Sequence, residues 1–265
     1  MVFLKKNIFF VLFVFLLSTG CAQTETSQSI KMVHSFSHKK GTVLVAKPSI
    51  QITNQQDMNK NISGVEPETE LFIISNPESM QVYVNKNRRL PEGYAPDDLV
   101  EPDISHLSPE GDDRRLLREE AARALEELFA AADQHGLNLV GVSGYRSNQR
   151  QTTIYQSSVA NNGQEHADKF SARPGTSEHE TGLAIDVSTS VIAFALEQTF
   201  QQTDEGSWLE ENAHQYGFII RYPEGKEDIT GYSYEPWHIR YVGKELANHL
   251  YHESLTLEEY FGYHY

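Results

Sequence analysis

The chain of 265 residues contains one cysteine, Cys21. Because a disulfide needs two cysteines, no internal disulfide can form, and the folded part must be stabilised by its hydrophobic core, with a bound metal ion as the remaining aid. The hydrophobic fraction of 39% is ordinary for a globular protein. We therefore expect one sizeable domain with its own core, together with additional segments.

The charge of the chain is strongly negative. Its 37 Asp and Glu residues outnumber its 22 Lys and Arg residues, which gives a formal net charge of −15 at pH 7. Nucleic acids and anionic membrane surfaces both attract proteins through a surplus of Lys and Arg. The composition therefore argues against nucleic acid as a partner and against electrostatic adhesion to a membrane.

The amino terminus has the layout of an export signal. Lys5 and Lys6 precede an apolar run over residues 8–17, and small residues follow it. This run is too short to span a bilayer core of about 30 Å. Cys21 directly follows LSTG, which resembles the lipobox of bacterial lipoproteins, although Ser18 stands where a leucine is usual. We expect a signal peptide over residues 1–20 and a lipid on Cys21, which would place the protein outside the cell on the outer face of the cytoplasmic membrane; plain secretion or an uncleaved anchor is the alternative.

The next segment differs in composition from the rest of the chain. Residues 21–69 are rich in Gln, Ser, Thr, Asn and Lys and contain only short apolar patches. Such segments bury too little apolar surface to fold, so we expect a mostly disordered tether. The folded domain is expected over residues 70–265.

Helical and strand patterns are mixed in this domain. A helix is expected to start at Ser108 and to end at Gly136, and a capping box of Ser207 and Glu210 predicts another helix start. Because no regular βαβ repeat is visible, we predict an α+β fold with a small, mostly antiparallel sheet flanked by helices. A further helix is expected over residues 151–159, and short strands over residues 81–84, 137–142, 183–188, 218–222 and 235–243.

The segment SEHETGLAID, residues 177–186, places His179, Glu180 and Asp186 close together. It is either a strand with a polar lead-in or part of a metal site. A catalytic zinc site needs three protein ligands and one open position for water. The helical HExxH layout is excluded, because Leu183 stands where the second histidine would be. The donors would therefore come from a loop and a strand end, at the edge of the predicted sheet.

Of the eleven histidines, His238 has the most informative surroundings. It lies at the edge of an apolar strand in SYEPWHIRYVG, three residues after Glu235. Pro236 favours an extended conformation at Glu235, so that both polar side chains can face one cavity. An aromatic-walled pocket raises the pKa of a glutamate, which suits a base working near neutral pH. Taken singly, these features are weak, since a His near an Asp is more often structural, and Arg146 in SGYRS would ordinarily be a surface charge.

Together, three ordered motifs resemble one family. SGYRSNQRQTTIY, SARPGTSEHETGLAIDV and EPWHIRYVG look like the D-alanyl-D-alanine carboxypeptidases of the VanY and LdcB type, which are zinc peptidases of bacterial peptidoglycan. The family pattern S-x-H-x-x-G-x-A-x-D is matched here by residues 177–186, and E-x-W-H by residues 235–238. The likeness covers roughly residues 80–250, with no motif missing.

The resemblance implies a zinc hydrolase with one Zn²⁺ per chain. His179, Asp186 and His238 would hold the ion, and Glu235 would be the general base. Arg146 would stabilise the oxyanion. A fixed cation aimed at developing charge lowers the energy of the transition state by about 3 kcal/mol in comparable sites. Recognition of the substrate's free carboxylate is assigned to a further group: Ser177, Gln151, Tyr145, Ser147 and Arg173.

The implied reaction removes the terminal D-alanine from a peptidoglycan stem pentapeptide, a D,D-carboxypeptidase activity. An L,D-carboxypeptidase cutting a tetrapeptide stem is the nearest alternative, because the choice depends on pocket shape around the penultimate residue. A non-catalytic wall-binding module is a third reading, whose signature would be a lost ligand or base, and none is lost here. The expected partner is the stem peptide, the only membrane contact is the lipid anchor, and the expected state is a monomer.

Overall fold

The computed structural model describes residues 71–262, except for the side chains of residues 169 and 170. These residues belong to one compact unit, Gly64–Tyr265. The expected signal peptide, Cys21 and the expected tether lie outside the described residues. No helix among the described residues has the length and apolar character needed to cross a bilayer.

A four-stranded sheet lies at the centre of the unit. It consists of β5 (Val140–Ser143), β6 (Ala184–Ser188), β8 (His238–Tyr241) and β7 (Phe218–Ile220), in that order, and every neighbouring pair is antiparallel. Two small sheets accompany it. β1 (Phe72–Ile73) pairs with β2 (Arg88–Arg89) in parallel, and β3 (Leu99–Val100) pairs with β4 (Leu117–Arg118) in antiparallel orientation.

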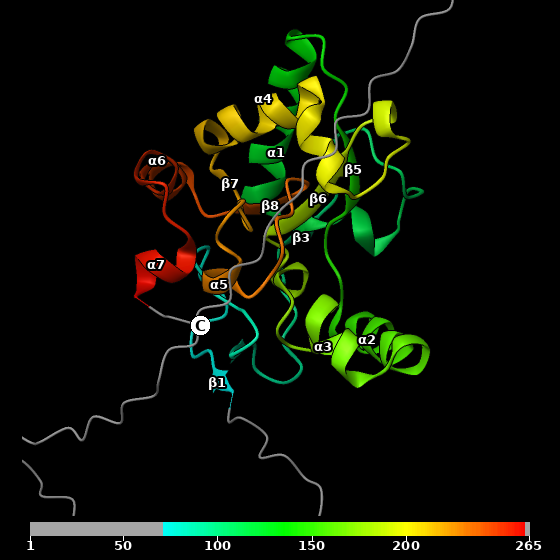
Figure 1. Ribbon diagram of the computed structural model, residues 1–265. Helices are drawn as coiled ribbons and strands as arrows, with labels where there is room; N and C mark the ends of the chain where they lie inside the picture. The colour runs from blue at the N-terminus through cyan, green and yellow to red at the C-terminus, as the bar shows by residue number, and fades with distance from the viewer. Residues whose placement is uncertain (1–70, 263–265) are drawn as a thin grey trace, which may run out of the picture. The chain divides into compact units, whose positions relative to one another are not determined.

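Helices flank the central sheet, as expected for an α+β fold (Figure 1). Buried Leu125 and Leu128 of α1 share one hydrophobic core with Ile185 of β6 and Ile239 of β8, so α1 packs on the sheet. Figure 1 shows α2 and α3 together to one side of the sheet, and α6 near α7 on the other side. The α-helices are α1 (Glu119–Gln134), α2 (Asn148–Asn162), α3 (Gln164–Phe170), α4 (Asp204–Asn212), α5 (Glu227–Thr230), α6 (Lys244–Glu253) and α7 (Leu257–Phe261), and the 3₁₀ helices are η1 (Asp113–Arg115), η2 (Glu178–Thr181), η3 (Ser190–Ile192), η4 (Gln198–Gln202) and η5 (Ala213–Tyr216).

The first long helix begins later than the sequence signals predict. Instead of starting at Ser108, α1 starts at Glu119, because η1 and β4 take up the intervening residues. Leu117 is drawn into β4, where it pairs with Val100, and the guanidinium of Arg118 donates to Asp98. The end of the helix is as predicted, with Gly136 at φ +75° in the left-handed region that favours glycine.

Two other local predictions are also wrong. Residues 81–84 form no strand, and the Val82 carbonyl accepts a hydrogen bond from the buried Arg240 side chain instead. The capping box at Ser207 is also absent. Thr203 caps α4, accepting from the Gly206 amide, while the Ser207 hydroxyl donates to the Gln201 carbonyl. The predicted strands near residues 140, 185, 219 and 239 and the helix after Gln151 are confirmed.

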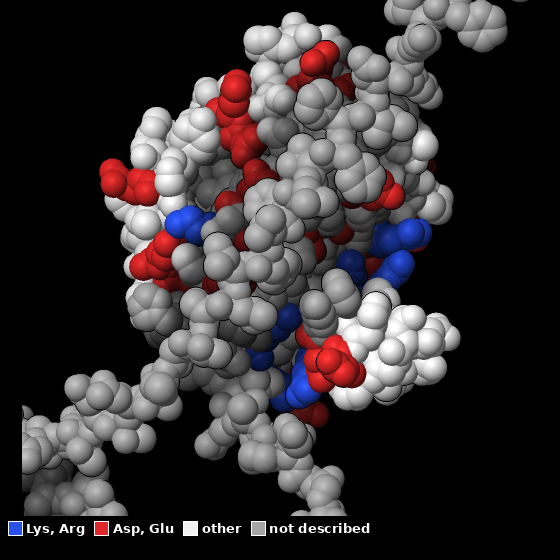
Figure 2. Space-filling view, viewed as in Figure 1, with Lys and Arg blue, Asp and Glu red and all other residues white. Residues whose placement is uncertain are grey.

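The charge of the surface is not uniform. Figure 2 shows Asp and Glu spread over most of this face, while most of the visible Lys and Arg side chains gather in its middle and lower part, near α2 and α3.

Candidate metal centre and active site

Three side chains from separate segments converge beside β6 and β8. Asp186 of β6 is paired in register with His238 of β8, and η2 places His179 just before β6. His179 Nε2 lies 3.4 Å from Asp186 Oδ2, and His238 Nδ1 lies 3.0 Å from Asp186 Oδ1. Each of the three residues offers one ligand atom, and these atoms all lie within 4.8 Å of one another. Among the described residues this is the one such cluster of His, Cys, Asp and Glu side chains.

A glycine makes this approach sterically feasible. Gly182 ends η2 at φ +67° and turns the chain from His179 into β6. A Cβ at this position would come within 2.9 Å of side-chain atoms of Arg118 and Leu99. The glycine of the motif therefore lets η2 pack closely against β3 and β4 while keeping His179 beside Asp186.

The donor set fits a divalent metal ion. All three side chains are buried, and the Nδ1 of His179 lies 2.9 Å from the Gly144 carbonyl. That carbonyl accepts the hydrogen on Nδ1, which leaves the Nε2 lone pair directed at the site. Burial lowers the pKa of His179 to about 3, so its imidazole is neutral, the form that binds metals.

The other imidazole has the opposite pKa shift. Burial acts to lower the pKa of His238, but the neighbouring carboxylates of Asp186 and Glu178 outweigh it and raise the pKa to about 9. Burial acts to raise the pKa of Asp186, but the two histidines hold it below its usual value. Asp186 and His238 thus stabilise each other's charges in the metal-free site.

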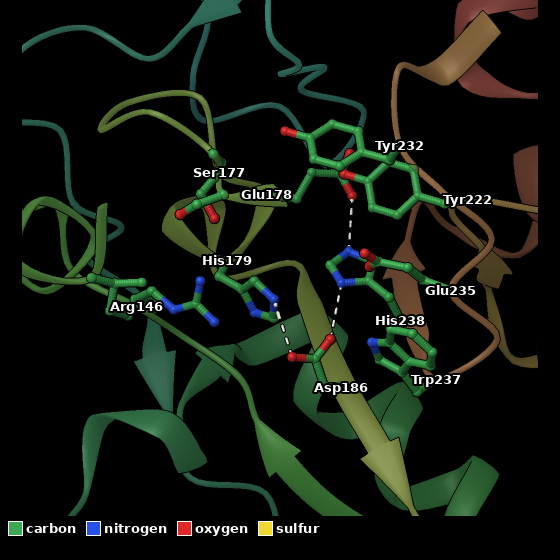
Figure 3. Close-up of a pocket in the computed structure, with 13 residues that line it drawn as sticks. Arg146, Ser177, Glu178, His179, Asp186, Tyr222, Tyr232, Glu235, Trp237 and His238 are labelled. Carbon is green, nitrogen blue, oxygen red and sulfur yellow. Dashed lines mark hydrogen bonds and ion pairs between the residues drawn. The ribbon is translucent and has the colours of Figure 1, made fainter. Parts of the chain in front are cut away.

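The cluster lies in a cavity of about 220 Å³ (Figure 3). Glu235 and Arg146 line the same cavity, together with Ser177 and three aromatic side chains, Tyr222, Tyr232 and Trp237. In Figure 3, Glu235 lies beside the His238 ring, and Arg146 lies on the opposite side, near His179. The sequence motifs that lie far apart in the chain therefore meet around one space.

Glu235 is the candidate base, and it lines the cavity. A turn before β8 holds it, with its amide donating to the Tyr222 carbonyl and its carbonyl accepting from the His238 amide. Burial raises the pKa of Glu235 to about 7. A carboxyl group that changes protonation near neutral pH can accept and return a proton during turnover.

Hydrogen bonds to neighbouring residues fix the position of Arg146. It follows β5, and its backbone amide donates to the His179 carbonyl. Its guanidinium Nη1 donates to Gln151 Oε1 at 2.9 Å, and Gln151 in turn donates to the Ala172 carbonyl at 2.6 Å. Gln151 is 1% exposed, so it supports Arg146 rather than forming part of the cavity wall.

The predicted substrate contacts divide into two groups. Ser177 lines the cavity. Gln151, Tyr145, Ser147 and Arg173 do not: Tyr145 is buried, Ser147 caps α2 by accepting from the Arg150 amide, and Arg173 pairs with Asp168 beside a second pocket. Their part in substrate binding stays a prediction.

Sequence reasoning missed a group of buried charges next to the site. Glu178 accepts from Arg221 Nε at 2.7 Å and from Arg240 Nη1 at 2.9 Å, and Arg221 also pairs with Glu258 of α7. Buried charges of this kind occur only when they are paired. The one available signal was an acidic residue directly before the metal-ligand candidate His179.

Comparisons with known proteins identify relatives of the chain. Residues 114–244 match the family model described as VanY, D-alanyl-D-alanine carboxypeptidase. The Bacillus subtilis (strain 168) protein YodJ is 43% identical over 249 residues, which cover 92% of this chain and 89% of the relative. The solved structure of the LD-carboxypeptidase LdcB has 47% sequence identity and a TM-score of 0.71, and the match covers 78% of this chain and 94% of that chain.

A second solved structure is a zinc-bound variant of the vancomycin resistance D,D-pentapeptidase VanY from a VanB-type cassette. It has 34% sequence identity and a TM-score of 0.57, and the match covers 69% of this chain and 98% of that chain. These matches extend beyond the three motifs, since the relative covers 92% of this chain and the two structures cover 78% and 69% of it. The chain therefore belongs to the VanY family of D-alanyl-D-alanine carboxypeptidases.

Proposed function

We propose that the protein is a zinc-dependent carboxypeptidase that removes the terminal D-alanine from peptidoglycan stem peptides. The observation that carries this proposal is the meeting of His179, Asp186 and His238 with Glu235 and Arg146 around one cavity. Zinc is supported by the donor set of two imidazoles and one carboxylate and by the Zn(II) in the related VanY structure. We propose one ion per chain.

Each residue of the cavity has a chemical role in this proposal. Bound zinc supplies Lewis-acid chemistry, lowering the pKa of a water molecule to about 7 and polarising the scissile carbonyl. Glu235 takes the proton from the attacking water and returns it to the departing amine. Arg146 stabilises the negative charge that develops on the carbonyl oxygen. The Ser177 hydroxyl donates a hydrogen bond to the terminal carboxylate of the substrate.

Two specificities are compatible with this chemistry. A D,D-carboxypeptidase shortens the pentapeptide stem, and the descriptions of the family model and of the VanY structure favour it. An L,D-carboxypeptidase shortens the tetrapeptide stem, and the higher identity and TM-score of the LdcB match favour this second candidate. Both release D-alanine, and they differ in the residue that precedes the cleaved bond.

Muropeptides of defined length test the proposal. The purified, zinc-loaded protein is incubated with pentapeptide and with tetrapeptide muropeptides, and the products are weighed by mass spectrometry. Loss of one D-alanine from the pentapeptide alone indicates D,D activity, and loss from the tetrapeptide indicates L,D activity. If neither peptide is shortened while zinc is bound, the hydrolase proposal is wrong and a wall-binding role takes its place.

We also propose that the protein is exported and anchored through a lipid on Cys21. The support is the order of Lys5 and Lys6, the apolar run and the small residues before the single cysteine. In cells that express the full chain, Cys21→Ala should release the protein from the membrane fraction and abolish labelling by a fatty acid. Unchanged membrane retention and labelling in this variant would contradict the anchor.

A further inference from the structure

Two buried polar atoms face each other behind the metal-ligand candidates. Glu178 Oε2 and His238 Nε2 are both buried, and neither has a hydrogen-bond partner. They lie 3.5 Å apart, on the side of the His238 ring that points away from Asp186 (Figure 3). Buried polar atoms usually find a partner, so two facing atoms at this distance form a hydrogen bond after a shift of a few tenths of an ångström.

The protonation of a metal-binding imidazole explains why they face each other. A neutral imidazole carries one hydrogen, on either Nδ1 or Nε2. His238 directs Nδ1 at Asp186, at 3.0 Å, so Nδ1 is the atom that can bind a metal ion beside Asp186. The hydrogen must then be on Nε2, and Glu178 Oε2 is the acceptor in front of it. His179 has the mirror arrangement, in which Nδ1 donates to the Gly144 carbonyl and Nε2 faces the site.

The Glu178 carboxylate is itself fixed in orientation. Its Oε1 accepts from Arg221 Nε at 2.7 Å and from Arg240 Nη1 at 2.9 Å, which leaves Oε2 for His238. The side chains of both arginines are 0% exposed, and Glu258 of α7 pairs with Arg221 from the other side. Two carboxylates and two guanidinium groups balance in charge, so the buried Glu178 stays an anionic acceptor.

We propose that Glu178 is a positioning residue that holds the hydrogen of His238 on Nε2 and so keeps Nδ1 free to bind zinc. The inference rests on the zinc site of the proposed function, and it adds a residue that does not touch the metal ion. Outer acceptors of this kind typically change metal affinity 10- to 100-fold when they are removed, about the size of effect that zinc titration resolves.

Glu178→Gln is the discriminating variant because it keeps the shape of the side chain. The two arginine donors compete for its single oxygen, which turns the amide NH₂ toward His238 Nε2. An NH₂ group there requires a lone pair on Nε2, so the hydrogen moves to Nδ1, where it blocks metal binding. We expect zinc affinity to fall about 10- to 100-fold. Affinity is measured on the full chain by competition with a chromophoric zinc chelator, at a temperature where circular dichroism shows that the variant is folded.

Glu258→Gln is the matched control. It removes a buried charge from the same Arg221, at 2.7 Å, and in the part of the chain that the structure describes no hydrogen bond or ion pair joins Glu258 to His238. We expect this variant to lose stability and to keep the zinc affinity of the parent protein. Equal weakening in both variants would mean that the ion-pair network matters only for folding, and unchanged affinity in Glu178→Gln would also overturn the inference.

A measurement on the unaltered protein covers the case in which Glu178→Gln fails to fold. Long-range ¹H–¹⁵N spectra of the zinc-loaded full chain report which imidazole nitrogen carries hydrogen. We expect His238 to be protonated on Nε2 and to bind zinc through Nδ1, and the reverse arrangement would refute the role of Glu178. If the parent protein binds no zinc at all, the proposed function fails together with the inference. If it binds zinc and the variants behave alike, only the inference fails.

Discussion

Replacing the candidate base by its neutral isostere, Glu235→Gln, should lower activity strongly and make the metal-free protein more stable at alkaline pH. Burial raises the pKa of Glu235 from 4.5 to about 7, so the folded state holds the carboxyl proton more tightly than the unfolded chain does. Stability from this group is therefore present at low pH and is lost as the pH rises from 4.5 through about 7. Above that range the folded protein contains a poorly solvated carboxylate, and glutamine removes this cost.

The magnitude follows from the two pKa values. At about 1.36 kcal/mol for each pH unit between 4.5 and about 7, the cost at pH 8 is roughly 3 kcal/mol, and at pH 5 it is less than about 1 kcal/mol. Because Glu235 is only partly buried in the open cavity, we take these figures as upper values. Denaturant unfolding of metal-free parent and variant at both pH values measures the difference. Bound zinc should shrink it, since a nearby cation stabilises the carboxylate.

The activity of Glu235→Gln should fall, although its stability at alkaline pH rises. Loss of a general base lowers kcat by about 10²- to 10⁴-fold, which is roughly 3–5 kcal/mol in the barrier. Zinc should be retained at the parent's stoichiometry, because Glu235 is not among the three donors. Glu180→Gln is the matched control, since it neutralises another buried carboxyl beside His179, one that does not line the cavity. We expect the control to keep most of the activity.

Three results would refute this reasoning. Near-parent kcat in Glu235→Gln would remove Glu235 from the mechanism. Loss of zinc in that variant would make Glu235 a ligand. An equal stability difference from the parent at pH 5 and at pH 8 would show that Glu235 has no raised pKa in the folded protein.

Further predictions concern the metal and the support of Arg146. His179→Ala removes one of three donors and should abolish both zinc binding, measured by metal analysis, and activity; full activity in a metal-free preparation would contradict the zinc assignment. Gln151→Ala removes the acceptor that holds Arg146 Nη1. Because oxyanion stabilisation acts mainly in the transition state, we expect kcat to fall about tenfold and KM to change less. A change confined to KM would instead support the substrate-binding role expected from the sequence. The pH profile of kcat/KM should fall on the acid side as Glu235 gains its proton, with a midpoint below about 7 once zinc is bound, and a flat acid side would argue against a carboxylate base.

Local patterns predicted the elements where neighbouring residues decide the structure. The apolar runs that became β6, β7 and β8 are buried on both faces, and Gly136 ends α1 because only its own backbone conformation matters there. The start of α1 was different. Ser108 and Pro109 form a good local start signal, but Leu117 pairs with Val100 in a small sheet, and the helix begins only at Glu119. Val100 lies outside the local start signal, so the sequence around Ser108 does not reveal this pairing.

The residues of the candidate site also include some that the sequence predicted and some that it did not. His179, Asp186, His238, Glu235 and Arg146 were recognised because their motifs have fixed spacing and order, and the structure brings them around one cavity. The support behind them was not predicted. Gln151 was expected to touch the substrate, yet it is buried and holds Arg146.

What the sequence determined by itself was the chemistry available: the motif residues in their order, and one cysteine that rules out an internal disulfide. What only the tertiary structure decided was which charges are buried together. Arg221 lies 43 positions from Glu178 and 37 positions from Glu258, and the three side chains meet with 0–1% exposure. The physical reason is that burial of a charge depends on partners delivered by the whole fold, whereas the identity of a donor atom belongs to its residue.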